Sequence, residues 1–224
     1  MRECTLDKSG DDVRTCVCGF LTHRELREEG RKLLAQLRSK CGAPRGSDRT
    51  NDMIRLATPE DATVLLALQQ RLDRQSSFML LEPDERDSDP GPLRARLAGH
   101  GPRGSFYLVA DSAQEARDGH TSLVGWLSVE VLPYRRAAHV GAVVLGVDAA
   151  HHGRGIGDAL LEACRVEAVR RGLERLELTV MVDNLRALGL YLRQGYQVEG
   201  LRRHAVCRQG EHVDEYFMAQ LLEP

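Results

Sequence analysis

The sequence predicts an α/β domain built on a mixed sheet, with a stretch of strand, glycine-rich loop and helix at its centre. Residues 143–161 read VVLGVDAAHHGRGIGDALL. The stretch opens with an apolar run typical of a strand, passes through a loop in which every second residue from 153 to 157 is glycine, and continues with apolar residues at helical spacing. Many β-type runs and few helices surround it, which favours a mixed sheet.

A doubly wound dinucleotide-binding sheet is disfavoured by the same stretch. In that fold the glycine motif lies near the start of the domain and reads G-x-G-x-x-G. Here the glycine loop comes late in the chain and has a different spacing.

Length and charge limit the classes of function. The chain has 224 residues and a formal net charge of −2, which is enough for one domain with an extension and gives no global field for nucleic acid or a membrane surface. No apolar run approaches the roughly 20 residues of a membrane span, and charged residues interrupt the N-terminus where a signal peptide would be apolar. We expect a cytoplasmic protein without nucleic-acid or membrane partners.

The first 52 residues differ from the remainder. Thr22 and Glu25 form a capping-box pattern, leucines follow at helical spacing, and residues 42–48 have the composition of a linker. We expect an extension with one helix and a linker over residues 1–52, and the main folded domain over 53–224. The alternative is that this helix binds a partner or forms a homodimer.

Four of the six cysteines lie in this extension. Cys16 and Cys18, with His23 and Cys41, do not have the C-x-x-C spacing of a usual zinc site. We expect free thiols and no metal.

The domain then alternates strand and helix signals. Residues 54–57 predict a first strand. Thr58 and Pro59 mark the start of a helix, because Thr caps a helix and Pro suits its first position. A short helix is expected at 93–98. Further strands are expected at 105–111, 123–132, 137–147, 175–181, from 198 onward and at 213–222, with helices ending near Gly172 and at 184–194.

The glycine loop is suited to a phosphate group. The first N–H groups of a helix have no intrahelical partner, and the helix dipole places about half a positive charge there. Gly153, Gly155 and Gly157 carry no Cβ that would keep a pyrophosphate from these amides. Arg154 adds a side chain for charge-assisted hydrogen bonds.

These residues resemble a known family. The run from His152 to Gly157, HGRGIG, is similar to the Arg/Gln-x-x-Gly-x-Gly/Ala loop that binds the coenzyme A pyrophosphate in the GNAT acetyltransferase superfamily, with His in place of Arg or Gln. Asn184, Tyr191 and the Gly195-Tyr196 pair follow in the order of that family's N-x-x-A-x-x-x-Y…G-[FY] ending. The resemblance covers roughly residues 53–222.

The resemblance implies a GNAT fold and transfer of acetyl from acetyl-CoA to a small-molecule or peptide amine. It implies Tyr191 as the general acid, since a phenol of pKa about 10 is protonated at neutral pH; the alternative is a Tyr that only packs the helix. The expected coenzyme A contacts are Leu145, Gly146, Val147, His152, Gly153, Arg154, Gly155, Ile156, Gly157 and Asn184. For Asn184 the alternative is helix capping alone, and for residues 145–147 an ordinary core strand. A glycine inside that strand favours close approach of another chain.

The general base is less well defined. Many family members carry Glu on the strand before the loop, and Ala142 stands there in this chain. The candidates are His139, Glu130 on the preceding strand, and a chain of waters. His204, Asp214 and Glu215 on the last two strands are expected to be structural or to border the substrate.

The missing strand carboxylate favours an acceptor of low pKa. At neutral pH about 10 % of an α-amine is neutral, against roughly 0.04 % of a Lys side chain. Two rival functions are a non-catalytic acyl-CoA sensor, which Tyr191 argues against, and an interaction module on the Arg-rich surface. The near-zero net charge and the lack of interleaved aromatic residues argue against that module.

Overall fold

The computed structural model describes residues 53–99, 101, 104–112 and 122–223. The expected extension, its helix and its four cysteines therefore lie outside the described residues. The strands are β1 (Met53–Leu56), β2 (Phe106–Asp111), β3 (Leu123–Val131), β4 (Val140–Val147), β5 (Arg175–Met181), β6 (Gln197–Arg208) and β7 (Glu211–Leu221). The helices are α2 (Ala62–Gln75), α3 (Gly91–Ala98), α4 (Ile156–Arg170) and α5 (Leu185–Arg193), with short 3-10 turns at Pro59–Asp61 and Ala149–His151.

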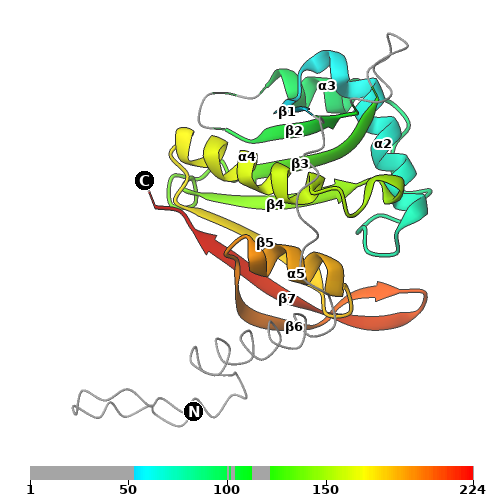
Figure 1. The fold of residues 1–224 in the computed structure, drawn as a ribbon, viewed down its shortest axis with the longest axis vertical. Coiled ribbons are helices and arrows are strands. Elements are labelled where there is room, and N and C mark those ends of the chain that lie inside the picture. The colour runs from blue at the N-terminus through cyan, green and yellow to red at the C-terminus, as the bar shows by residue number, and fades with distance from the viewer. Residues whose placement is uncertain (1–52, 100, 102–103, 113–121, 224) are drawn as a thin grey trace.

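The strands form one seven-stranded sheet in the order β1-β2-β3-β4-β5-β7-β6. All neighbours are antiparallel except β4 and β5, which run parallel because α4 connects them as a crossover. The expected mixed α/β sheet is confirmed (Figure 1).

The parallel pair is incomplete. β4 is paired with β3 along seven residues, but with β5 only from Val140 to Ala142. Beyond the pair Ala142 and Glu177, β5 stays paired with β7 while β4 stays paired with β3. The two halves of the sheet consequently fan apart, and Figure 1 shows the half with β5, β7 and β6 running away from β4. We call the space between β4 and β5 beyond Ala142 the split.

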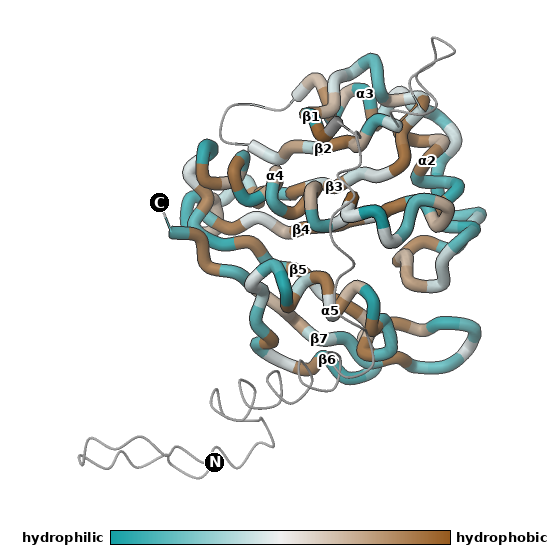
Figure 2. The backbone as a smooth tube through the Cα atoms, in the orientation of Figure 1, coloured by the Kyte–Doolittle hydropathy of each residue, from teal (hydrophilic) through white to brown (hydrophobic). Residues whose placement is uncertain are grey.

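Helices cover both faces of the sheet. On one face, Leu65, Leu72 and Leu93 of α2 and α3 pack with Trp126 of β3. On the other, α4 and α5 bury Leu160 and Leu188 with side chains of β2 to β7. Figure 2 shows the apolar residues concentrated along the strands of both halves, while the turn between β6 and β7 is largely hydrophilic.

The observed boundaries differ little from the predicted ones. The first helix opens with a 3-10 turn in which the N–H of Thr58 donates to the carboxylate of Asp61 at 2.7 Å. The strand expected over 137–147 begins at Val140, because residues 132–139 form the connection from β3. Gly172 and Gly195, at φ of 78° and 92°, end the last two helices in the left-handed conformation that glycine favours.

Candidate functional site

The glycine loop leaves the start of α4 open. Gly153 and Gly155 have φ of 79° and 82°, and a Cβ built on either would meet no atom within 4 Å. Gly155 is the N-cap residue and supplies no side chain to the first amides of α4. These amides and the positive end of the helix dipole therefore face space that an anion can occupy.

His152 and Arg154 lie on the same exposed loop. The His152 Nε2 lies 2.9 Å from the carbonyl oxygen of Val147, and an Arg154 Nη2 lies 3.5 Å from the carbonyl of Ala150. His152 thus ties the loop to the end of β4. The long Arg154 contact leaves that guanidinium close to the open amides, where it adds positive charge.

The edge of β4 beside the split carries unpaired backbone groups. The N–H of Asp148 donates to Val124 of β3 at 2.8 Å. Because backbone direction alternates along a strand, the N–H and C=O groups of Val143, Leu145 and Val147 point away from β3. Pairing with β5 has ended at Ala142, so the groups of Leu145 and the N–H of Val147 face the split without a partner strand, while the C=O of Val147 contacts Nε2 of His152.

Gly146 has a packing role that the sequence did not indicate. A Cβ at this position would lie 2.7 Å from Leu72 and 2.8 Å from the indole nitrogen of Trp126. The space above Gly146 is therefore filled by this chain's own side chains, and ligand contact at this residue stays a prediction. The glycine allows Trp126 and α2 to pack closely on β4.

Helix α5, which carries Tyr191, packs against the start of α4. A Cβ on Gly157 would lie 2.9 Å from Leu190, and Gln194 donates to Asp158 of α4 at 3.0 Å. Tyr191 itself is 7 % exposed and packs against Tyr196. Burial raises the pKa of Tyr191 to about 12, so its hydroxyl keeps its proton at neutral pH. Asn184 caps α5, since its side chain accepts from the N–H of Ala187 at 3.2 Å.

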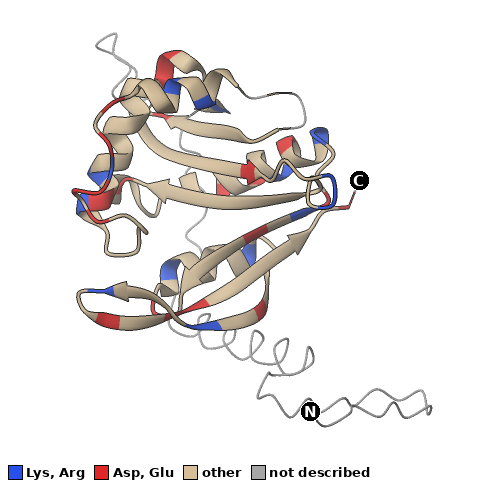
Figure 3. Ribbon diagram, turned by 180° about the vertical axis from the view of Figure 1, so that it is seen from behind, with Lys and Arg blue, Asp and Glu red and all other residues tan. Residues whose placement is uncertain are grey.

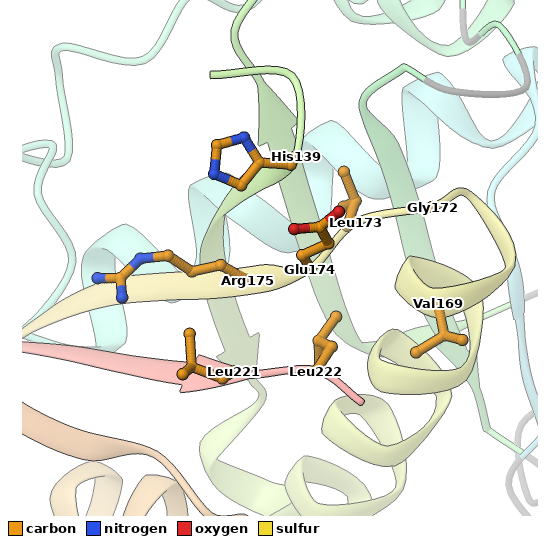
Figure 4. A pocket seen from close by; sticks show the side chains of 8 residues that line it. All are labelled: His139, Val169, Gly172, Leu173, Glu174, Arg175, Leu221 and Leu222. Carbon is orange, nitrogen blue, oxygen red and sulfur yellow. The ribbon is translucent and has the colours of Figure 1, made fainter. Parts of the chain in front are cut away.

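The structure does not bring His139 together with these residues. His139 precedes β4 at the end where β4 is paired with β5, about 25 Å from the glycine loop at strand rise. It lines an open pocket of about 540 Å³ with Glu174, Arg175, Leu221 and other residues (Figure 4). Its role as a base stays a prediction that this position does not favour.

A second pocket, of about 550 Å³, lies at the wide end of the split. Its walls are the end of α2, the connection that follows it, Met181 at the end of β5, and residues 205–209 of the β6–β7 hairpin. Arg208 on that wall pairs with Asp183 and lies 5.3 Å from the Phe78 ring, which joins the hairpin to the 76–83 segment. We call this pocket the wide-end pocket. Figure 3 shows both signs of charge interspersed over this side of the molecule.

Three carboxylates lie near the split. Glu130 and Glu177 flank Ala142, as its paired neighbours on β3 and β5. Glu215 of β7 is buried, and accepts hydrogen bonds from Thr179 and Arg202. Glu177 and Thr179 have no sequence signal of their own, because strand pairing is what brings them to this place.

Comparison with known proteins identifies the family. Residues 68–196, more than half of the chain, match the family described as acetyltransferase (GNAT) family. The chain belongs to the GNAT family. The matched residues include the glycine loop, the open edge of β4 and Tyr191.

Curated GNAT relatives share the same part of the chain. The L-amino acid N-acetyltransferase AaaT of Escherichia coli (strain K12) is 36 % identical over 101 residues, covering 44 % of this chain and 62 % of the relative. The N-alpha-acetyltransferase RimI of Mycobacterium tuberculosis is 41 % identical over 107 residues, which cover 46 % of this chain and 61 % of the relative. The matched stretch thus spans less than two thirds of either relative.

Solved GNAT structures share the fold. A GNAT acetyltransferase from Streptococcus pneumoniae has a TM-score of 0.68 at 24 % identity, covering 77 % of this chain and all of that one. The acetyltransferase yncA from Salmonella typhimurium, solved with acetyl-CoA, has a TM-score of 0.67 at 19 % identity. The match covers 78 % of this chain and 95 % of that one. Within the described ranges, no helix is both long and apolar enough to cross a membrane.

Proposed function

We propose that this GNAT protein is an acetyl-CoA-dependent N-acetyltransferase that acts on an α-amine, either of an amino acid or of a peptide N-terminus. The observation that carries the proposal is the open glycine loop at the end of a strand whose outer edge is unpaired. The two features lie next to each other and bind complementary parts of one ligand.

The residues of this site fit coenzyme A. The exposed amides of residues 153–157 and the Arg154 guanidinium would bind its pyrophosphate. The C=O group of Leu145 and the N–H group of Val147 would pair with the amides of its pantetheine arm, as a neighbouring strand would. The split leaves this edge free, and acetyl-CoA bound along it would place its thioester near the narrow end.

The chemistry is thioester aminolysis. The amine nitrogen forms a bond to the acetyl carbonyl carbon, the carbonyl oxygen takes up charge beside the backbone N–H of Leu145, and the C–S bond then breaks with its electron pair on sulfur. Tyr191 would donate its proton to that thiolate. Although burial makes Tyr191 a weaker acid than a free phenol, the same apolar surroundings raise the pKa of the thiol that accepts the proton.

The acceptor would enter through the wide-end pocket. Two relatives support an α-amine, since one is named for L-amino acids and the other for N-alpha acetylation. The fraction of neutral amine at neutral pH favours an α-amine over a Lys side chain by a factor of about 250, which is about 3 kcal/mol.

An amine panel with acetyl-CoA, read by thiol release, tests the function. We expect release with amino acids or short peptides that carry a free α-amine, and much slower release with N-blocked lysine. The same rates are expected for a chain that begins at Met53. Binding of acetyl-CoA without release for any amine would favour the sensor, and acetylation of lysine side chains alone would contradict the α-amine assignment.

A further inference from the structure

The proposed reaction needs a group that removes a proton from the acceptor amine. We propose that Thr179 takes this proton and passes its own to Glu215, so that the two residues act as a relay. This inference rests on the proposed function, and it assigns the proton acceptor that β4 does not supply at Ala142.

Thr179 is placed where the amine must arrive. Leu178 and Val180 point into the core beneath α4 and α5, so Thr179 points to the opposite face, which is the α2 face. The β4–β5 register ends at Ala142 and Glu177; continued by two residues, it sets Thr179 opposite Val144, next to the N–H of Leu145. Thr179 is exposed, and is the first β5 residue beyond the pairing whose side chain faces an amine entering from this side.

The hydrogen bond of Thr179 orients its hydroxyl group. The hydroxyl donates to Oε1 of Glu215 at 3.2 Å. A threonine hydroxyl has one hydrogen and two lone pairs. Because the hydrogen is used toward Glu215, the lone pairs remain for an incoming N–H.

Glu215 is held so that it can receive a proton. It is 8 % exposed, and its other oxygen, Oε2, accepts from an Nη1 of Arg202 on β6 at 2.9 Å. The guanidinium thus holds Oε2, while Oε1 points to Thr179. The other charged side chains on the same face of β5 are Glu177 and Arg175, which pair with each other at 3.0 Å.

The other candidates are less well placed. Glu177 accepts from Nε of Arg175 at 3.0 Å, and Arg175 lies farther from the split along β5, so this contact holds the carboxylate away from the thioester. Glu130 lies on β3, so β4 stands between it and the split. His139 lies at the far end of β4.

The relay balances. The bound ammonium first loses one N–H proton to Oγ1 of Thr179 while the original Thr179 proton moves to Oε1 of Glu215, and the neutral amine nitrogen then bonds to the carbonyl carbon. After the C–S bond breaks and Tyr191 protonates the sulfur, the second proton lost by the nitrogen restores Tyr191, and solvent takes the proton from Glu215. The products are the amide and coenzyme A with a free thiol.

A pair of substitutions at residue 179 tests the relay. Thr179→Val keeps the shape and a β-branched side chain but removes the hydroxyl, whereas Thr179→Ser keeps the hydroxyl. With acetyl-CoA and the best amine of the panel, we expect kcat/KM to fall about 10²- to 10⁴-fold in the Val variant and to stay within about tenfold of wild type in the Ser variant. Acetyl-CoA affinity should be unchanged in both.

The pH profile separates proton transfer from a structural effect. Below the amine pKa of about 8, a variant without the relay can use only neutral amine, so log kcat/KM should rise by about one per pH unit. Wild type should rise less steeply. Glu215→Gln should behave like Thr179→Val, and Glu177→Gln, the matched control on the same face, should keep the wild-type slope.

Two results would overturn the relay. If the wild-type protein is active and Thr179→Val has the same kcat/KM and the same pH slope as wild type, Thr179 takes no proton. If Glu177→Gln instead shows the steep slope, the base is Glu177. A wild-type protein that transfers no acetyl group to any amine removes the proposed function and the relay together.

Discussion

The two edges of β4 differ in how far they are paired. One edge is joined to β3 along seven residues, and the other to β5 along three. The paired edge lies against a closely packed face, where Trp126 and Leu72 leave no room for a Cβ on Gly146. The unpaired edge leads to a loop where a Cβ on Gly153 or Gly155 would touch nothing.

This contrast indicates how one strand serves both stability and binding. On the paired edge, hydrogen bonds and packed side chains hold the sheet together. On the open edge, backbone groups are left without strand partners, and β5 keeps its own ladder with β7. Substitutions on the two sides should therefore affect different measurements.

The largest effect is expected on the open side, at Tyr191. Tyr191→Phe keeps the ring and its packing against Tyr196 but removes the proton that would go to the thiolate. Because a positioned general acid contributes typically 10²- to 10⁴-fold, we expect kcat to fall by that range. Acetyl-CoA affinity and the thermal midpoint should stay close to those of wild type.

An acyl donor with a more acidic thiol needs less protonation, so it should recover part of the lost rate in the Phe variant. A wild-type kcat in that variant would show that the hydroxyl is only structural and that another group protonates coenzyme A.

A smaller effect, on stability, is expected at the packed face. Gly146→Ala adds a Cβ within 2.7 Å of Leu72 and 2.8 Å of Trp126, and overpacking of this kind typically costs about 1–3 kcal/mol. Urea unfolding should show that loss. Tryptophan fluorescence should also change, since Trp126 is the single tryptophan of the chain. An unchanged unfolding midpoint would mean that α2 yields easily and that this face is not tightly packed.

Much of the fold could be predicted because local signals agree with it. The glycines at 172 and 195, the capping pattern at Thr58 and the β-type runs placed most elements within a few residues of their observed bounds. The glycine loop was found for the same reason, since a strand, a glycine repeat and a helix are consecutive in the chain.

The rest depends on contacts between distant residues. Nothing in the sequence of β4 tells where its pairing with β5 stops, because the same apolar run suits a paired and an unpaired edge. Gly146 must lack a side chain because Trp126, 20 residues earlier, packs against it. Thr179 forms its hydrogen bond with Glu215, 36 residues later. Glu215 was expected to be structural or a substrate-edge residue, and only the sheet order brings it to the split.

The central claim is that the open loop and edge bind acetyl-CoA, and titration calorimetry on two glycine variants tests it most directly. Gly155 and Gly172 lie at opposite ends of α4, both in the left-handed conformation, at φ of 82° and 78°, and both with open space around a built Cβ. Valine at either position carries a similar strain of about 1–3 kcal/mol. Only Gly155 lies at the proposed pyrophosphate site.

Gly155→Val should therefore weaken acetyl-CoA binding at least about tenfold, equivalent to about 1.4 kcal/mol. Gly172→Val should bind as wild type does. Equal affinities in wild type and both folded variants would contradict the assignment of this loop to coenzyme A.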